Sequence, residues 1–584
     1  MFQMGQLAEL QFLYPEYKGL LFEDLLKGIS GEVLKKITTY LIGKNLYSEK
    51  EIELNDLIEN WFSKGNSAFA EQFSERVKKY EEDSKKRVSI VHTISCLKVL
   101  QYGLELQEKG SLNTKSKEQS EIDILFALLI CNQNEDYNQT KDKVKIKAMF
   151  PANYPEALLF NYSFPVNDIT NFYFADYTYC QVIKSLMFFG FLDSNSEGQE
   201  LLKRFCSYYR ISSWKGYLER VLPLISAWSN RDKPSSVDLV LEKNANYQDN
   251  YLFLERLAMN DYVKLEDVDY IKIREKPLLK LDDTTFRVIH PLFISDKIYK
   301  GLYFLFNQLN SEQPKFIKSF RSWYTSNFTE GVCFQQIIEY SIEQYDARFF
   351  DDELKKLKVI GPPDCYLREG DDVFLIENKD ILINASIKGS YDFEATINEI
   401  RKKLLSDNGR PVGIGQIITN IRKLLSKENT FDPVFKPDKT LIYPLLVVHD
   451  NMYDTVGLNK ILNLFFNEEL AILNDEGFDL TRVKPLILIN IDTLIQISDV
   501  LNKRWCNLKE LIEAYNVNSK LQKKLPFSES DFTKTMVPFS TFAINYLNTK
   551  LGKNWRSENL MKYLFEKNAG ESSPHSDEGK GTLY

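Results

Sequence analysis

The sequence predicts a multidomain α+β protein, with a large, mostly helical N-terminal region, a small β module, an α/β core with a mixed central sheet, and a helical C-terminus. Three observations predict this organisation. The chain of 584 residues is too long for one ordinary hydrophobic core, so two to four domains are expected. Apolar residues recur at helical spacing through about the first 230 residues. Beyond about residue 250, short alternating or continuous apolar runs, which are typical of strands, appear between helical segments.

The composition is that of a globular protein and sets limits on its function. Hydrophobic residues make up 43% and charged residues 27% of the chain, which excludes a disordered protein. The net charge of −8 argues against a protein that coats nucleic acid non-specifically, but it is compatible with an enzyme that has a local basic groove. The seven cysteines form no C-x-x-C pair, so we expect reduced thiols in a cytoplasmic protein. We expect neither a signal peptide nor a membrane-spanning segment, and therefore no membrane partner.

Changes in the spacing of apolar residues and in composition divide the chain into six expected segments. These are a helical N-terminal region over residues 1–110, a second helical region over 111–245, a small β/α adaptor module over 246–320, an α/β domain over 321–515, C-terminal helices over 516–567, and a disordered tail over 568–584. No catalytic constellation occurs in the first 240 residues. We expect the helical N-terminal region to sense, to target, or to assemble with a protein partner or a second copy of the chain.

The adaptor module is predicted from three short runs, residues 270–274, 277–281 and 285–289, followed by a helix over 297–309. A small β module beside a helix resembles the wing of a winged helix, which binds DNA. It equally resembles a packing adaptor between domains. We favour the adaptor because no basic recognition helix precedes it.

A β-hairpin is predicted over residues 362–379, where two apolar runs flank the polar turn 369–372. With this turn, the opposed pairs are Arg368 with Val373, Tyr366 with Leu375, and Asp364 with Glu377. Opposed residues point to the same face with their Cβ atoms about 5 Å apart, and Lys379 shares the face of Glu377. Two carboxylates and an ammonium therefore converge at one end of the hairpin.

Charges at this position favour a functional site. The hairpin is otherwise apolar on both faces, so it belongs inside a buried sheet, where an unpaired charge is unfavourable. Mg²⁺ commonly takes one or two protein carboxylates and completes its octahedron with water and substrate phosphate. A neighbouring ammonium stabilises charge on that phosphate. The arrangement suits metal-assisted hydrolysis of phosphodiesters. A surface hairpin with a cross-strand ion pair is the alternative.

The order of the expected elements around the hairpin is also informative. In chain order we expect a helix over residues 330–350, the hairpin, helices over 391–405 and 413–421, buried strands over 441–448 and 485–491, and a helix over 494–501.

Pro363-Asp364 followed by Glu377-Asn378-Lys379 resembles the signature of the PD-(D/E)xK, or restriction-endonuclease-like, nuclease superfamily. The resemblance covers about residues 325–510, and the order of elements matches the αββ(β)αβ core of that superfamily. It implies Mg²⁺ or Mn²⁺ as cofactor, with Asp364 and Glu377 as metal ligands. It also implies that Lys379 stabilises the attacking hydroxide or the charge of the transition state.

The resemblance extends to two helices. Many members place a glutamine on the helix after E-x-K to orient water or substrate; Gln416 fits this position, although Asn420 stands where some branches have a tyrosine. Many members also carry a glutamate on the first helix, where this chain has Gln335. That ligand is either missing or supplied by Glu330 or Glu339, and Gln335 and Glu339 are one turn apart.

Five basic residues near this core are candidate nucleic-acid contacts: Arg401, Lys402, Lys403, Arg422 and Lys423. They would touch the phosphate backbone and position the substrate while reading little sequence. The alternative is a solvated helix face paired with nearby glutamates.

Together, these features predict a Mg²⁺-dependent endonuclease that hydrolyses DNA, as an effector in bacterial defence against phage or foreign DNA. Two alternatives stay open. One is a catalytically silent scaffold or nucleic-acid-binding subunit that keeps the fold. The other is an RNA-cleaving member of the same fold, because the triad acts on the phosphodiester and grooves elsewhere select the substrate.

Overall fold

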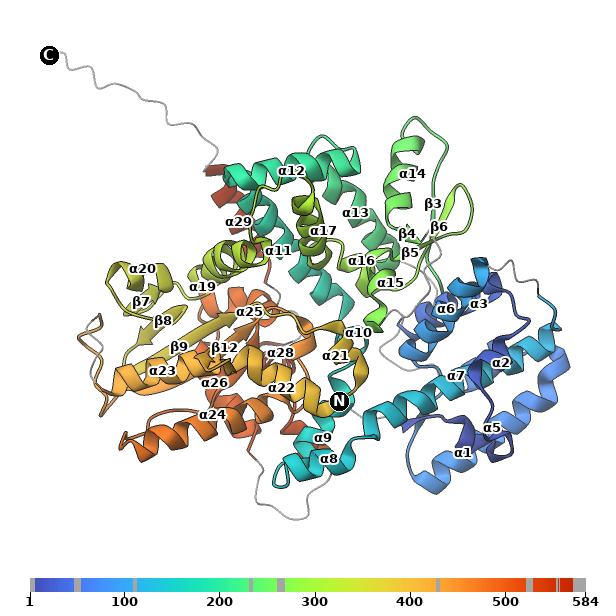
Figure 1. The fold of residues 1–584 in the computed structure, drawn as a ribbon, viewed down its shortest axis with the longest axis horizontal. Coiled ribbons are helices and arrows are strands. Elements are labelled where there is room, and N and C mark those ends of the chain that lie inside the picture. The colour runs from blue at the N-terminus through green and yellow to red at the C-terminus, as the bar shows by residue number, and fades with distance from the viewer. Residues whose placement is uncertain are drawn as a thin grey trace.

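The computed structural model describes residues 6–46, 54–108, 113–230, 235–259, 268–426, 431–520, 529–552, 555 and 557–570. The predicted mixed α+β fold with a helical C-terminus is confirmed: helices predominate, and a mixed sheet lies in the second half of the chain (Figure 1). Within the described segments, no helix has the length and apolarity needed to cross a bilayer. The predicted boundary at residue 110 lies outside the described residues.

The N-terminal helices form a layer on the right of Figure 1, apart from the central sheet on the left. They are α1 (Leu10–Leu13), α2 (Phe22–Leu26), α3 (Gly31–Asn45), α4 (Leu54–Trp61), α5 (Ser67–Ser84), α6 (Thr93–Glu108) and α7 (Lys117–Thr140). The hydroxyl of Ser30 caps α3 by accepting a hydrogen bond from the backbone nitrogen of Val33. Helix α3 packs closely on α6 because a Cβ at Gly103 would lie 2.8 Å from Cβ of Leu34.

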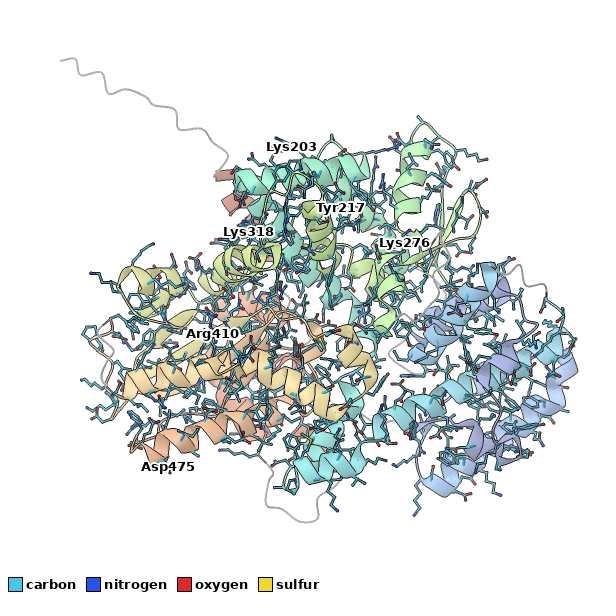
Figure 2. All side chains as sticks on the ribbon, in the orientation of Figure 1. Lys203, Tyr217, Lys276, Lys318, Arg410 and Asp475 are labelled. Carbon is cyan, nitrogen blue, oxygen red and sulfur yellow. The ribbon has the colours of Figure 1, made fainter. Side chains whose placement is uncertain are left out.

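The second helical region contains α8 (Lys143–Met149), α9 (Tyr154–Ser163), α10 (Asn167–Thr170), α11 (Phe174–Ser194), α12 (Ser196–Tyr209) and α13 (Trp214–Ser229). Helix α11 is its axis, and its dense aromatic run is buried. Phe188 and Phe189 are fully buried and join a core that continues into the central sheet. In Figure 2, Tyr217 lies inside this region and Lys203 lies at its outer edge. The aromatic run is therefore packing, as the lack of interleaved basic residues indicates.

The small β module is a four-stranded sheet in the order β3-β6-β5-β4. Its elements are β3 (Asp238–Val240), α14 (Tyr247–Arg256), β4 (Ala258–Met259), α15 (Ile271–Glu275), β5 (Leu278–Lys280), β6 (Thr285–Val288), α16 (Pro291–Ser295) and α17 (Lys300–Ser311). The predicted strands over 277–281 and 285–289 are confirmed. The strand predicted over 270–274 is wrong, because this segment forms α15. Five alternating residues do not distinguish a strand from one helical turn: Ile273 is buried, and Arg274 pairs with Asp168 at 2.8 Å.

The central sheet has the order β13-β12-β9-β8-β7. Its strands are β7 (Ala347–Phe350), β8 (Cys365–Glu369), β9 (Asp372–Lys379), β12 (Leu441–Val448) and β13 (Ile487–Asn490). Strands β7, β8 and β9 are antiparallel neighbours, while β9, β12 and β13 run parallel. The predicted helix over residues 330–350 is wrong at its end, since the helix stops at Ser341 and residues 347–350 form β7. A four-residue edge strand is too short to show a period of its own.

Helices cover both faces of this sheet. Alternate strand residues face two separate cores, with Leu375 and Leu446 on one side and Phe374 and Leu445 on the other. The first face is covered by α22 (Phe393–Leu404), α23 (Ile414–Leu425) and α24 (Leu458–Asp475). The second is covered by the π-helix η4 (Tyr324–Phe334), α19 (Gln335–Ser341) and α25 (Ile491–Asn502).

Three C-terminal helices join the core of the second face. They are α26 (Leu508–Asn518), α28 (Phe539–Leu551) and α29 (Asn559–Gly570), whereas Phe532 of α27 (Glu529–Lys534) joins a separate small cluster. Trp555 is buried and joins the same core. Helix α29 runs to Gly570, so residues 568–570 are helical and their predicted disorder is wrong. The remainder of the predicted tail, 571–584, lies outside the described residues.

Candidate active site

The hairpin of β8 and β9 has the predicted register. Arg368 is opposite Val373 and Tyr366 is opposite Leu375. The pairing continues to Glu369 opposite Asp372, so the turn itself is only two residues long. Gly370 occupies this turn with φ of 60°, a left-handed conformation that glycine adopts without a steric penalty. The tight turn fixes the register, and the register brings Asp364 level with the end of β9.

Three charged side chains meet at this end of the hairpin. Nζ of Lys379 lies 2.8 Å from Oε1 of Glu377 and 3.4 Å from Oδ2 of Asp364. The same Oδ2 accepts a hydrogen bond of 2.7 Å from the backbone nitrogen of Asn378. The ammonium therefore lies between the two carboxylates, and the backbone of β9 holds one of them in place. We call these three residues the triad.

Burial determines the protonation of the triad. The side chain of Glu377 is fully buried. This burial and the charge of Asp364 raise the pKa of its carboxyl group and Lys379 lowers it, and the net result is a pKa of about 8. Burial also acts to lower the pKa of Lys379, but the charges of Glu377 and Asp364 outweigh it, so the net shift is upward. Lys379 is therefore a cation at neutral pH, and Glu377 holds its proton more tightly than an ordinary carboxyl group does.

A third carboxylate faces the triad from η4. Burial raises the pKa of Glu330 to about 7, the negative charge of Asp364 adds to the shift, and Lys379 opposes it. Glu330 in turn contributes to the raised pKa of Glu377. Gln335 begins α19, one helical turn beyond Glu330. Of the two glutamates that the sequence left open, Glu330 thus interacts electrostatically with the triad.

Gln416 caps its own helix. Its Oε1 accepts a hydrogen bond of 3.0 Å from the backbone nitrogen of Gly413, and its backbone oxygen accepts one of 3.0 Å from Nδ2 of Asn420. Gly413 has φ of 49°, and a Cβ there would lie 2.7 Å from the backbone oxygen of Leu404. The start of α23 is therefore set by local backbone geometry. A role for Gln416 beside the scissile phosphate stays a prediction.

The predicted nucleic-acid contacts on α22 and α23 are mostly paired with glutamates. Arg401 lies 3.1 Å from Glu468, and Arg422 lies 2.7 Å from Glu476. Lys403 lies 3.8 Å from Glu399 on its own helix, and Lys402 is exposed. These pairs are what a solvated helix face produces, and contact with phosphate stays a prediction.

Lys423 has a different environment. Its Nζ donates to the backbone oxygens of Ile360 and Gly361, the second at 3.1 Å. These residues lie in the loop that leads into Asp364. Lys423 therefore holds the loop that precedes Asp364 in place.

A second charged cluster was missed by the sequence reasoning. The three parallel strands β9, β12 and β13 are followed within two residues by Asp380, Asp450 and Asp492. Each aspartate pairs with a cation from the helical half of the chain: Arg321 at 3.1 Å, Lys300 at 2.9 Å and Lys184 at 2.6 Å, respectively. The sequence feature that could have revealed this cluster is the aspartate that follows each of the three parallel strands.

Comparisons with protein families, with curated proteins and with solved structures find no match to this chain. The geometry of the site therefore carries the functional argument. Within the described residues, no group of three or more Asp, Glu, His and Cys side chains is arranged to hold a metal ion. The pair formed by Asp364 and Glu377 is smaller than such a group but within the range that Mg²⁺ uses.

Proposed function

We propose that this chain is a divalent-cation-dependent nuclease with a restriction-endonuclease-like core. The observation that carries the proposal is the convergence of Asp364, Glu377 and Lys379 at the end of a hairpin in the mixed central sheet. A helix, a hairpin, a helix and a parallel strand occur in the order that the resemblance implies, with β7 added at the edge.

The residues present fit a hard divalent cation. The carboxylate of Glu377 is fully buried, and its Oε2 has no hydrogen-bond partner within the described chain. Lys379 contacts Oε1, so Oε2 is the buried oxygen that is left to meet a further cation. Asp364 and Glu377 would hold the ion, which when bound supplies Lewis acidity toward the phosphate and activates water. Glu330 interacts electrostatically with both carboxylates.

The chain's own groups supply the remaining parts of the chemistry. In phosphodiester hydrolysis, water adds to phosphorus, one P–O bond breaks, and the leaving oxygen takes up a proton. Lys379 is a permanent cation beside the carboxylates, so it stabilises the negative charge that grows on the phosphoryl oxygens. The backbone nitrogen of Asn378 keeps Asp364 oriented during the reaction.

DNA is the substrate that we propose, with defence against phage or foreign DNA as the biological setting. RNA is the alternative, because the triad acts on a group that both polymers share. A partner protein or a second copy would bind through the N-terminal helices. None of these assignments follows from the triad alone, so the first experiment compares substrates directly.

The test is cleavage of plasmid, linear duplex, single-stranded DNA and RNA by the purified protein with Mg²⁺ or Mn²⁺. Glu377→Gln preserves the volume of the buried side chain and removes its charge, so it should abolish cleavage, as should a chelator. Asp371→Asn, in the exposed turn of the same hairpin, is the matched control and should cleave like wild type. Cleavage that survives Glu377→Gln would place the activity elsewhere. If wild type cleaves nothing and binds no Mg²⁺, the scaffold alternative holds.

A further inference from the structure

A hydrogen bond between two neighbouring strands lies directly beside the triad. Asn378 stands between Glu377 and Lys379 on β9, and His449 is the residue that follows β12. Nε2 of His449 lies 2.9 Å from Oδ1 of Asn378. Asn378 is fully buried and His449 is 8% exposed. The pair is therefore inside the protein, at the end of the sheet where the triad lies.

The pair interrupts an apolar face of the sheet. Phe374 and Ile376 on β9, and Val447 on β12, belong to the core of the second face. Side chains alternate between the two faces of a sheet, so Asn378 and His449 are the next members of the same two series. Polar side chains that end two apolar series are unfavourable unless they bond to each other. The hydrogen bond between the two strands is what allows both residues to be buried there.

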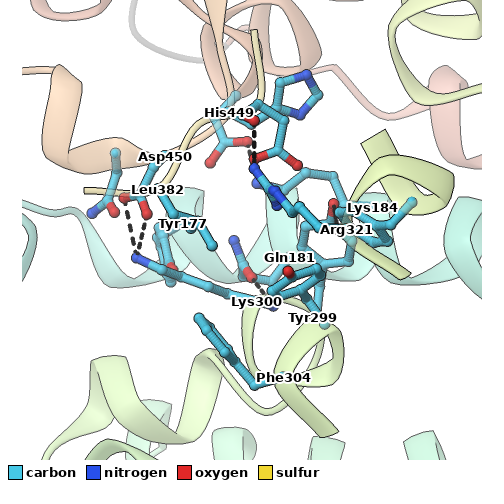
Figure 3. Close-up of a pocket in the computed structure, with 15 residues that line it drawn as sticks. Tyr177, Gln181, Lys184, Tyr299, Lys300, Phe304, Arg321, Leu382, His449 and Asp450 are labelled. Carbon is cyan, nitrogen blue, oxygen red and sulfur yellow. Dashed lines mark hydrogen bonds and ion pairs between the residues drawn. The ribbon is translucent and has the colours of Figure 1, made fainter. Parts of the chain in front are cut away.

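The hydrogen bond also fixes the tautomer of His449. Burial lowers the pKa of His449 to about 4, so its ring is neutral at neutral pH. An amide oxygen only accepts, so Nε2 carries the ring proton and donates it to Asn378. The ring lines a cavity of about 50 Å³ that the three ion pairs of the second charged cluster also line (Figure 3). His449 is thus a neutral, directed donor to the middle residue of the triad segment.

Stability alone does not account for this polar pair. Nδ2 of Asn378 and Nδ1 of His449 are buried, and neither has a hydrogen-bond partner within the described chain. Each of these atoms loses hydration on folding without a protein bond in return. Two apolar side chains of similar shape would be about as stable at these positions. A polar pair kept beside charged groups under these conditions favours a role in the site.

The backbone of Asn378 connects the pair to the triad. Pairing between β8 and β9 ends with Cys365 opposite Ile376, so the N–H of Asn378 lies beyond that ladder. Oδ2 of Asp364 accepts a hydrogen bond of 2.7 Å from this N–H. In the sheet, β9 lies between β8 and β12. Asn378 is therefore held by Asp364 on the β8 side and by His449 on the β12 side.

We propose that His449 is a positioning residue of the triad. Its hydrogen bond to Asn378 limits the tilt of the last residues of β9, and the backbone N–H of Asn378 in turn sets the position of the Asp364 carboxylate. The inference rests on the proposed function, in which Asp364 and Glu377 hold a divalent cation. Mg²⁺ requires near-ideal octahedral geometry, whereas Ca²⁺ accepts irregular coordination. The hydrogen bond from His449 therefore matters more for Mg²⁺ than for Ca²⁺.

The experiment is isothermal titration calorimetry of the full-length protein with Mg²⁺ and with Ca²⁺, without nucleic acid. His449→Met removes the N–H donor and should weaken Mg²⁺ binding about tenfold or more, as loss of an outer-sphere partner does, and weaken Ca²⁺ binding less. His449→Gln keeps an N–H donor and should restore most of the Mg²⁺ affinity. His290→Met is the matched control: it removes a buried histidine that caps α16 in the small β module, and both affinities should stay unchanged.

A double variant separates positioning from stability. Asn378→Leu combined with His449→Met replaces both polar groups by apolar ones, so no acceptor is left buried without its donor. Its melting temperature should therefore be closer to that of wild type than the melting temperature of His449→Met alone. Its Mg²⁺ binding should stay weak, because the side-chain bond between β9 and β12 is still absent. If His449→Met does not fold, the double variant and His449→Gln provide the comparison.

Wild-type Mg²⁺ affinity in the double variant would overturn the positioning role, because lost stability would then explain the effect of His449→Met. Equal weakening of Mg²⁺ and Ca²⁺ binding would overturn it as well. These outcomes differ from failure of the proposed function. Wild type that binds Mg²⁺ but cleaves no nucleic acid would refute the nuclease and leave the comparison of variants intact, whereas wild type that binds no Mg²⁺ would refute both.

Discussion

The decisive residue of the candidate site is Glu377, a carboxylic acid that is fully buried and shares Lys379 with a second carboxylate. Its chemistry depends on pH because burial and the charge of Asp364 raise its pKa from the usual value of 4.5 to about 8. The folded, cation-free protein therefore holds a proton that the unfolded chain releases near pH 4.5.

The raised pKa of Glu377 predicts how the stability of the folded protein depends on pH. Because the folded-state pKa is the higher one, the stabilising contribution is fully present below about pH 4.5 and is lost as pH rises through about 8. Glu377→Gln has no such proton to lose. In EDTA, the melting temperature of wild type should therefore fall relative to Glu377→Gln, by several degrees between pH 5 and pH 9. Parallel melting curves for the two proteins across this range would contradict the assignment.

Lys379 should be required for turnover rather than for folding. Replacing it by Met removes the positive charge beside the reacting phosphate and should lower the cleavage rate by about 10²-fold or more. Lys356→Met changes an exposed lysine, 77% accessible, on the nearby helix α20 (Asp351–Lys356) and is the control. Initial rates at saturating Mg²⁺ provide the comparison. A Lys379→Met enzyme as fast as the control would exclude the proposed role.

The site was predictable from sequence only in part, for reasons that are clear at the level of residues. The positions of Asp364, Glu377 and Lys379 follow from one hairpin register, which a short polar turn fixes locally. Glu330 depends on how a π-helix places its side chains, which sequence spacing does not show. The cavity depends on helices from residues 174–323 meeting the strand ends, a long-range arrangement that leaves no local pattern.

At the scale of elements, long apolar strands were the most predictable features. Strand β12 has the predicted bounds because eight apolar residues between polar flanks favour no other structure. The predictions of short elements were wrong: β7 was predicted as the end of a helix, and α15 was predicted as a strand. In segments of four or five residues, tertiary contacts outweigh local propensity.

The start of α23 provides a prediction at this scale. Gly413→Ala places a Cβ 2.7 Å from the backbone oxygen of Leu404 at a φ of 49°, so it should destabilise the protein by about 1–3 kcal/mol. Gly409→Ala is the matched control, since φ there is 82° but nothing lies within 4 Å of the added atom. Chemical denaturation should show the larger loss for Gly413→Ala. Equal losses would mean that the close approach to Leu404 has no consequence.

At the scale of the whole molecule, the helical half and the central sheet share one core. Helix α11 packs on α25 and on η4, and a single buried cluster extends from Cys180 to Leu564. The three ion pairs that line the cavity connect the same two parts of the chain. Helices η4 and α25, which cover one face of the sheet, are therefore themselves covered by α11, which precedes the sheet by more than a hundred positions.

It follows that residues 321–584 should not fold alone. Removing the preceding residues exposes the sides of η4 and α25 on which α11 packs and leaves Asp450 and Asp492 without their cations. The fragment should show no cooperative thermal transition, whereas the full chain should unfold its central sheet and α11 together. A soluble fragment with a sharp transition of its own would show that the core is divisible.

The proton on Glu377 also makes occupancy of the site depend jointly on pH and on the concentration of divalent ions. A divalent ion can occupy the carboxylate pair only by expelling that proton, so uptake of the ion acidifies the solution. Lowering the pH and lowering the ion concentration then have the same effect on the site. In a cell, the protein would respond to the ratio of free divalent ions to hydrogen ions, and a modest alkaline shift would fill the site at constant ion supply.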